Sequence, residues 1–144
     1  MIYLDSSCLL KLLLEEPESD AVRQAVAREP DVVVSALTEL ETAVQLRAGL
    51  LGGVYRARRY RAYLAQVEAF KAIEPFRFRT LPGDLFQTAL RQNRNAGRVH
   101  CRSLDRLHLA AMEELGIRRL MTHDASQATV ARALGFEVFR PGHR

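Results

Sequence analysis

Short apolar runs alternate with longer amphipathic stretches along the whole chain. The runs that we expect to form strands are residues 1–4, 31–35, 76–81, 119–122 and 137–140. The stretches that we expect to form helices, with apolar residues recurring every three or four positions, are residues 7–16, 19–29, 36–49, 54–72, 83–97, 103–116 and 125–135. Because strands alternate with helices, the pattern predicts an α/β fold with a mostly parallel central sheet.

Four glycines stand where predicted helices end, at Gly49, Gly97, Gly116 and Gly135. Helices commonly end on a residue in the left-handed conformation, which glycine adopts without a steric penalty. We therefore expect these four positions to be helix C-caps.

The length and composition indicate a globular protein. A chain of 144 residues with 48% hydrophobic and 26% charged residues fits one domain, residues 1–144. No apolar run approaches the roughly 18 residues of a membrane span. The N-terminal stretch carries Asp5 and lacks the basic region of a signal peptide. We expect a cytoplasmic protein without membrane contact, whose Cys8 and Cys101 stay reduced rather than form a disulfide.

The charge is basic and carried mainly by arginine. The net charge is +4, and of the 21 basic residues only Lys11 and Lys71 are lysines. Arginine binds phosphate in a bidentate manner and stacks on bases, which suits a nucleic-acid partner. The same bias can reflect the codon composition of a genome, so charge alone leaves this question open.

Four acidic residues occupy positions where an α/β sheet usually carries its active site. Asp5 and Asp124 follow predicted strands directly, Asp105 lies in the first turn of the helix that opens at Ser103, and Glu41 lies in the second turn of the helix after residues 31–35. Ligands bind beyond the carboxyl ends of parallel strands, so all four acids are expected at one edge. Each acid alone also has an ordinary explanation as a turn residue or helix cap.

Glu39 and Glu41 compete for the second acidic position. Residues two apart on a helix point about 200° away from each other, so only one of them faces the site. We place an apolar stripe through Leu37, Val44 and Ala48, and Glu41 falls on this stripe whereas Glu39 does not. A carboxylate on a buried stripe needs a partner, which favours Glu41, with Glu39 either a rim residue or a residue that shares or replaces the role of Glu41.

Four neighbouring carboxylates require protons or a cation. Two of them about 4 Å apart repel by roughly 4 kcal/mol at an effective dielectric constant of 20. The chain has no Cys and His set spaced for zinc, and all-oxygen sites favour Mg2+ or Mn2+. A divalent metal in a basic protein suggests hydrolysis of phosphodiester bonds by a metal-activated water.

Three segments resemble the PIN-domain ribonucleases, and within them the VapC-type toxins of prokaryotic toxin-antitoxin pairs. They are YLDSSCLLKLLLEEPES, SALTELETAVQLR and RSLDRLHLAAMEELGIRRLMTHDASQATVARALGFEV. The resemblance implies a three-layer α/β/α sandwich, a homodimer, an RNA substrate and an inhibitory cognate antitoxin. It also implies that Mg2+ or Mn2+ is held by Asp5, Glu41, Asp105 and Asp124, with Ser6 and Thr122 supporting the carboxylates or the water on the metal.

Several basic residues are candidates for contact with RNA. Arg47, Arg102 and Arg106 are predicted beside the metal, where we expect at least one of them to hold the scissile phosphate. The segment from Tyr55 to Tyr63 interleaves arginines with tyrosines, which suits unpaired RNA but equally suits an amphipathic helix with solvated arginines and Val54, Ala57, Leu64 and Val67 inside. His108 is either a proton donor or RNA contact, or a half-buried histidine with a hydrogen-bond partner.

The function that best unites these features is a metal-dependent endoribonuclease. A non-catalytic RNA- or protein-binding module with the same fold is the alternative. A small-molecule phosphatase or phospho-acceptor domain would also place an aspartate after its first strand, but neither lysine follows a late strand as such folds require.

Overall fold

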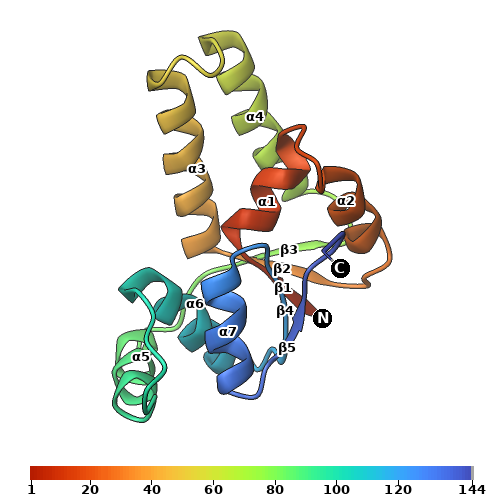
Figure 1. The fold of residues 1–144 in the computed structure, drawn as a ribbon. Coiled ribbons are helices and arrows are strands. Elements are labelled where there is room, and N and C mark those ends of the chain that lie inside the picture. The colour runs from red at the N-terminus through yellow and green to blue at the C-terminus, as the bar shows by residue number, and fades with distance from the viewer. Residues whose placement is uncertain (144) are drawn as a thin grey trace.

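The computed structural model describes residues 1–143 as a five-stranded sheet with helices on both faces (Figure 1). The strands are β1 (Ile2–Leu4), β2 (Val32–Ser35), β3 (Phe76–Arg79), β4 (Arg119–Met121) and β5 (Glu137–Phe139). The helices are α1 (Ser6–Leu13), α2 (Ser19–Ala27), α3 (Ala36–Leu51), α4 (Ala57–Phe70), α5 (Leu85–Arg94), α6 (Ser103–Glu114) and α7 (Ala125–Ala133). Within this part of the chain no helix is long and apolar enough to cross a bilayer.

The sheet has the strand order β3-β2-β1-β4-β5, and every pairing in it is parallel. Strands β2 and β3 are added in chain order on one side of β1, and β4 and β5 are added on its other side. The strand order therefore reverses between β1 and β4, whose last residues Leu4 and Met121 lie side by side. A crevice forms beyond the carboxyl ends of strands at such a switch point.

Alternation of side chains along the strands divides the core into two layers. Ile2 and Leu4 of β1 pack in one cluster with residues of α1 and α2. Tyr3, between them, points to the opposite face and packs with residues of α5, α6 and α7. Helices thus cover both faces of the sheet, and the predicted three-layer α/β/α fold is confirmed.

Helices α3 and α4 form a hairpin that extends beyond the carboxyl edge of the sheet (Figure 1). The prediction that Gly49 ends a helix is wrong, because α3 continues to Leu51. The Tyr55 hydroxyl donates to the Leu46 carbonyl at 2.6 Å and occupies the space where a side chain at position 49 would lie. Gly49 is thus needed for close packing inside the helix. Gly116 and Gly135 do follow helix ends with positive φ, as predicted.

Candidate active site

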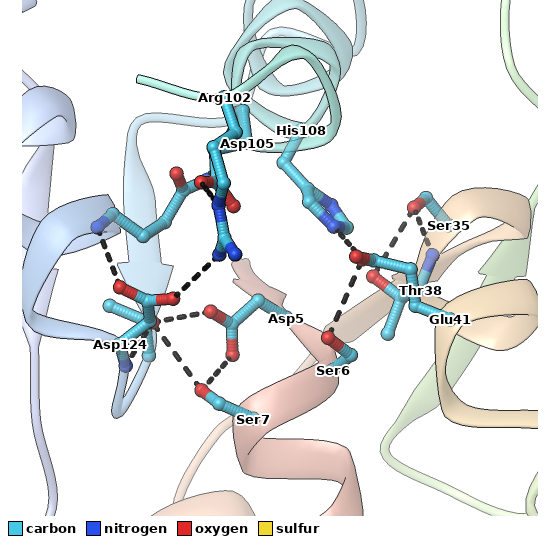
Figure 2. A network of polar contacts seen from close by, with 12 residues as sticks. Asp5, Ser6, Ser7, Ser35, Thr38, Glu41, Arg102, Asp105, His108 and Asp124 are labelled. Carbon is cyan, nitrogen blue, oxygen red and sulfur yellow. Dashed lines mark hydrogen bonds and ion pairs between the residues drawn. The ribbon is translucent and has the colours of Figure 1, made fainter. Parts of the chain in front are cut away.

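One hollow at the carboxyl edge gathers the four acids that the sequence singled out (Figure 2). Its volume is about 450 Å³. Asp5 follows β1, Glu41 lies in the second turn of α3, Asp105 in the first turn of α6, and Asp124 immediately before α7. The side chains enter from four separate elements because each of these elements starts or ends at the crevice between β1 and β4.

Asp5 lies at the floor of this acidic pocket and is 4% exposed. It caps α1 by accepting the Cys8 amide at 3.2 Å, and it accepts hydrogen bonds from the Ser7 hydroxyl at 2.6 Å and from the Thr122 hydroxyl. Burial raises the pKa of the Asp5 carboxyl above its ordinary value, and the Ser7 and Thr122 hydroxyls oppose that shift only in part. The pocket therefore holds its central carboxylate at an electrostatic cost.

Glu41 is the acid of α3 that faces the pocket. Its carboxylate contacts His108 Nε2 and accepts a long hydrogen bond of 3.4 Å from the Ser6 hydroxyl. Glu39 instead pairs with Lys71 at 2.7 Å, away from the pocket. Glu41 thus lines the pocket as predicted, although the stripe used to choose it is wrong, since Val44 is 59% exposed. The buried face of α3 includes Thr38, Thr42 and Leu46.

His108 links Glu41 to the core of the sheet. The Tyr3 hydroxyl lies 2.7 Å from His108 Nδ1 and 2.6 Å from the Ser35 hydroxyl, and all three residues are at most 2% exposed. One consistent set of donors runs from the Ser35 hydroxyl to Tyr3, from Tyr3 to Nδ1, and from Nε2–H to Glu41. The predicted hydrogen-bond partner of His108 is confirmed and is an acid of the pocket, but the residue is fully buried rather than half-buried. Its role as a proton donor stays a prediction.

Arg102 bridges the two remaining acids. Its Nε donates to Asp105 at 3.1 Å and its Nη2 lies 3.7 Å from Asp124 (Figure 2). Asp124 also caps α7 by accepting the Gln127 amide at 3.0 Å. The Arg102 side chain is 78% exposed, so it supplies positive charge from the rim of the pocket without being fixed in it.

The donor set suits a hard divalent cation, although its members are engaged with protein donors. Besides Glu16 and Glu18, which pair with Lys11, four carboxylates and the hydroxyls of Ser6 and Ser7 line this hollow, and oxygen ligands of this kind bind Mg2+ or Mn2+. Among residues 1–143 no three His, Cys, Asp or Glu side chains stand close enough to chelate an ion as they are placed. Arg102 lies between two of the carboxylates, and its departure would free them for a cation.

Two of the three predicted phosphate-binding arginines do not reach the acidic pocket. Arg47 is exposed on α3 and Arg106 is buried on α6, and neither lines the pocket. Arg47 lies six residues beyond Glu41, and Arg106 points about 100° away from Asp105, so each leaves its helix in another direction. Their predicted position beside the metal is therefore wrong, whereas Arg102 lies where it was expected.

Ser6 and Thr122 contact carboxylates as the sequence suggested, and other pocket residues were missed. Ser7 binds Asp5 and also accepts the His123 amide at 2.8 Å. Lys11 and Arg140 line the rim from opposite ends of the chain. The second hydroxyl of the SS pair was a possible signal for Ser7, whereas nothing local in the sequence marked Tyr3 or Arg140.

Comparison with known proteins gives both a family and close relatives. The family model described as PIN domain matches residues 2–133. Ribonuclease VapC46 of Mycobacterium tuberculosis is 34% identical over 142 residues, which cover 97% of this chain and 97% of that protein. Ribonuclease VapC35 of the same species is 31% identical over 148 residues, covering 99% of this chain and 98% of that protein.

Solved structures share the fold at lower sequence identity. The crystal structure of VapC20 of Mycobacterium tuberculosis, described as a sarcin-ricin loop cleaving toxin, superposes with a TM-score of 0.73 at 20% identity and covers 98% of this chain and all of that one. FitAcB from Neisseria gonorrhoeae superposes with a TM-score of 0.76 at 18% identity over the full length of both chains. At 18–20% sequence identity, these structures support the fold and nothing further about function.

Proposed function

The chain belongs to the PIN domain family, and from this premise we propose that it is a metal-dependent endoribonuclease, the toxin of a toxin-antitoxin pair. The observation that carries the proposal is the convergence of Asp5, Glu41, Asp105 and Asp124 on one hollow beside the switch point of the sheet. The names of the relatives, which are called ribonucleases, agree with it.

Each acid of the pocket has its own support. Thr122 and Ser7 fix both oxygens of Asp5, and His108 and Ser6 orient Glu41 toward the pocket. The four carboxylates would hold Mg2+ or Mn2+. Such an ion supplies positive charge for the phosphoryl oxygens and lowers the pKa of the attacking water.

Arg102 has a different role from the acids. It neutralises Asp105 and Asp124 in the absence of other cations, and it is exposed enough to turn outward and bind the phosphate of the RNA. Arg140 at the rim adds positive charge that attracts the RNA backbone, whereas Lys11 is already paired with Glu16 and Glu18. In-line attack by water with these groups in place leaves a 5′-phosphate and a 3′-hydroxyl.

A pair of variants on α3 tests the proposal with a matched control. Glu41→Gln removes a carboxylate that lines the pocket, whereas Glu39→Gln removes one that pairs with Lys71 outside it. With total cellular RNA and added Mg2+ or Mn2+, we expect Glu41→Gln to cleave about a hundredfold more slowly, because the loss of a group that only supports a metal ligand already costs about 10–100-fold in metal affinity or activity. Glu39→Gln should cleave like the parent.

Two results would decide against the proposal. Equal cleavage by Glu41→Gln, Asp5→Asn and the parent, with no cleavage by a mock preparation from cells that lack the protein, would remove the pocket from the reaction. RNA binding without turnover at any concentration of Mg2+ or Mn2+ would instead favour a non-catalytic binding module. Sequencing of RNA ends after brief expression would identify the RNA and the bond that is cut.

Partner binding extends the proposal beyond the pocket. A hollow of about 1060 Å³ between the end of α1 and the start of α4 is lined by Leu13, Tyr55 and Tyr63 and shares Glu16 with the acidic pocket. We infer that a segment of an antitoxin lies there and reaches the acids. The family resemblance also predicts a homodimer, which stays a prediction. The exposed side chains of Leu40 and Leu104 provide apolar surface at which two copies could pack.

A further inference from the structure

A second hollow lies on the other side of the first turn of α6 from the acidic pocket. Its volume is about 380 Å³, and it is bounded by α5, by the connection between α5 and α6, and by the first turns of α6. Phe86, Leu90 and Arg106 are among its lining residues, and none of the lining residues is acidic. We refer to it as the Arg106 hollow.

Arg106 is the unexplained feature of this hollow. The residue is 5% exposed, and within residues 1–143 its Nε and Nη1 atoms have no hydrogen-bond partner and no contact with solvent. Leaving these two buried donors without a partner costs about 1–3 kcal/mol for each. The Arg106 side chain contacts the Cys101 thiol, but burial raises the pKa of that thiol, so Cys101 is a neutral partner that supplies no opposite charge. The position of Arg106 therefore suits an anion from outside the chain.

Resting on the proposed ribonuclease function, we propose that the Arg106 hollow binds a nucleotide of the RNA that flanks the cleaved bond. Arg106 would donate to its phosphate through Nη2, because Nε and Nη1 are closed to solvent, and the Phe86 ring, which is 64% exposed, would stack on its base. The exposed Arg94 and Arg98 beside the hollow make this surface attractive to a polyanion.

The position of the hollow fits a strand that passes through both sites. Asp105 points into the acidic pocket and Arg106 into the hollow, so the two sites are separated by one helix, about 10 Å across. Arg102 lines the acidic pocket and Ser103 lines the hollow, which makes the start of α6 the shared wall. An RNA strand that crosses this wall would place its cut phosphate on one side and a flanking nucleotide on the other.

A second copy of the chain is the competing occupant. It would have to bring a carboxylate to Arg106, whereas Glu113, an acid of α6, is already paired with Arg91 of α5. The basic surroundings and the absence of any acid from the lining favour RNA. The self-association of the parent and of Arg106→Met is therefore measured as well, because it would reveal a second copy as the occupant of the hollow.

Binding of a fluorescent oligoadenylate in EDTA tests the hollow without relying on cleavage. Arg106→Met should weaken binding about tenfold and lower the slope of log K against log salt by about 0.7, the contribution of one phosphate contact on a single strand. Phe86→Ala should also weaken binding about tenfold, through lost stacking, but leave the salt slope unchanged. Arg28→Met is the control, because Arg28 lies just before β2 at the opposite edge of the sheet.

The outcomes separate this proposal from the proposed function. Unchanged RNA affinity and salt slope in Arg106→Met overturn it, and weaker self-association of that variant in sedimentation velocity would assign the hollow to a second copy. Glu41→Gln should still bind the oligoadenylate, because it alters the acidic pocket alone. Urea unfolding checks that Arg106→Met folds, and the exposed position of Phe86 keeps the test available if it does not.

Discussion

Replacing Tyr3 by phenylalanine removes one oxygen atom from the centre of the polar chain behind Glu41. The Tyr3 hydroxyl lies 2.6 Å from the Ser35 hydroxyl and 2.7 Å from His108 Nδ1, in a region closed to solvent. Ser35 retains Thr38 as a neighbour, but Nδ1 is left without a hydrogen-bond partner among residues 1–143. Leaving a buried polar atom unsatisfied costs about 1–3 kcal/mol.

We therefore expect Tyr3→Phe to lower the free energy of unfolding by about 1–3 kcal/mol. In a chain of this length each kcal/mol lowers the melting temperature by about 2–4 °C. Urea unfolding at neutral pH in EDTA measures the loss as a shift in midpoint with an unchanged m-value. Tyr63→Phe is the control, because Tyr63 is half-buried, packs edge-on against Tyr55 and lies outside the polar chain.

The comparison with His108→Ala shows whether the hydroxyl acts through the histidine. If it does, the double variant loses less stability than the two single losses together, by about 0.5 kcal/mol or more. A Tyr3→Phe protein within about 0.5 kcal/mol of the parent would show that the hydroxyl does not hold His108, since surface changes alone are of that size. In that case the orientation of the Glu41 side chain would depend on its hydrogen bond with Ser6 and on the backbone of α3.

Two further predictions concern the stability of the pocket and of the hairpin. Because burial raises the pKa of Asp5 in the folded state, the parent loses stability as pH rises from below the ordinary value of 3.8 through the raised value. The non-titrating Asp5→Asn variant should therefore gain stability relative to the parent between acidic and neutral pH in EDTA. A loss of stability by Asp5→Asn relative to the parent over the same pH range would contradict the buried charge. Gly49→Ala should destabilise the protein by about 1–3 kcal/mol in urea unfolding, because its Cβ would lie 2.3 Å from the Tyr55 hydroxyl oxygen, and a stabilised variant would show that α3 and α4 separate without cost.

The sequence predicts the sheet and the acidic edge because both depend on local patterns. Strand and helix differ in hydrophobic period, and a residue directly after a parallel strand must lie at its carboxyl edge. Asp5 and Asp124 could therefore be placed from their position alone. Glu41 was also placed, but for an incorrect reason, since the face of α3 that is buried is decided by its packing against α1 and α4.

Contacts between distant residues could not be predicted in the same way. Tyr3 and His108 meet across 105 positions, and neither residue type nor spacing marks them as partners. The direction in which the Arg106 side chain points also depends on how α5 packs against α6. The residues of one helical turn point to every side of the helix, so the sequence alone does not show which of them faces the hollow. A sequence pattern identifies which elements meet at the edge, whereas tertiary packing decides which side chain of each element reaches it.

Arg102 explains how so acidic a pocket stays folded without a cation and how it could bind the proposed divalent ion. Its guanidinium shares its charge between Asp105 and Asp124, while Thr122 and His108 serve the other two acids. An ion pair with so exposed a partner is worth about 0.2–1 kcal/mol, much less than a buried pair. Little is therefore lost when a divalent ion displaces Arg102, and the freed guanidinium is then next to the place where the RNA phosphate would bind. The exposure of this one arginine makes the same carboxylates compatible with both states.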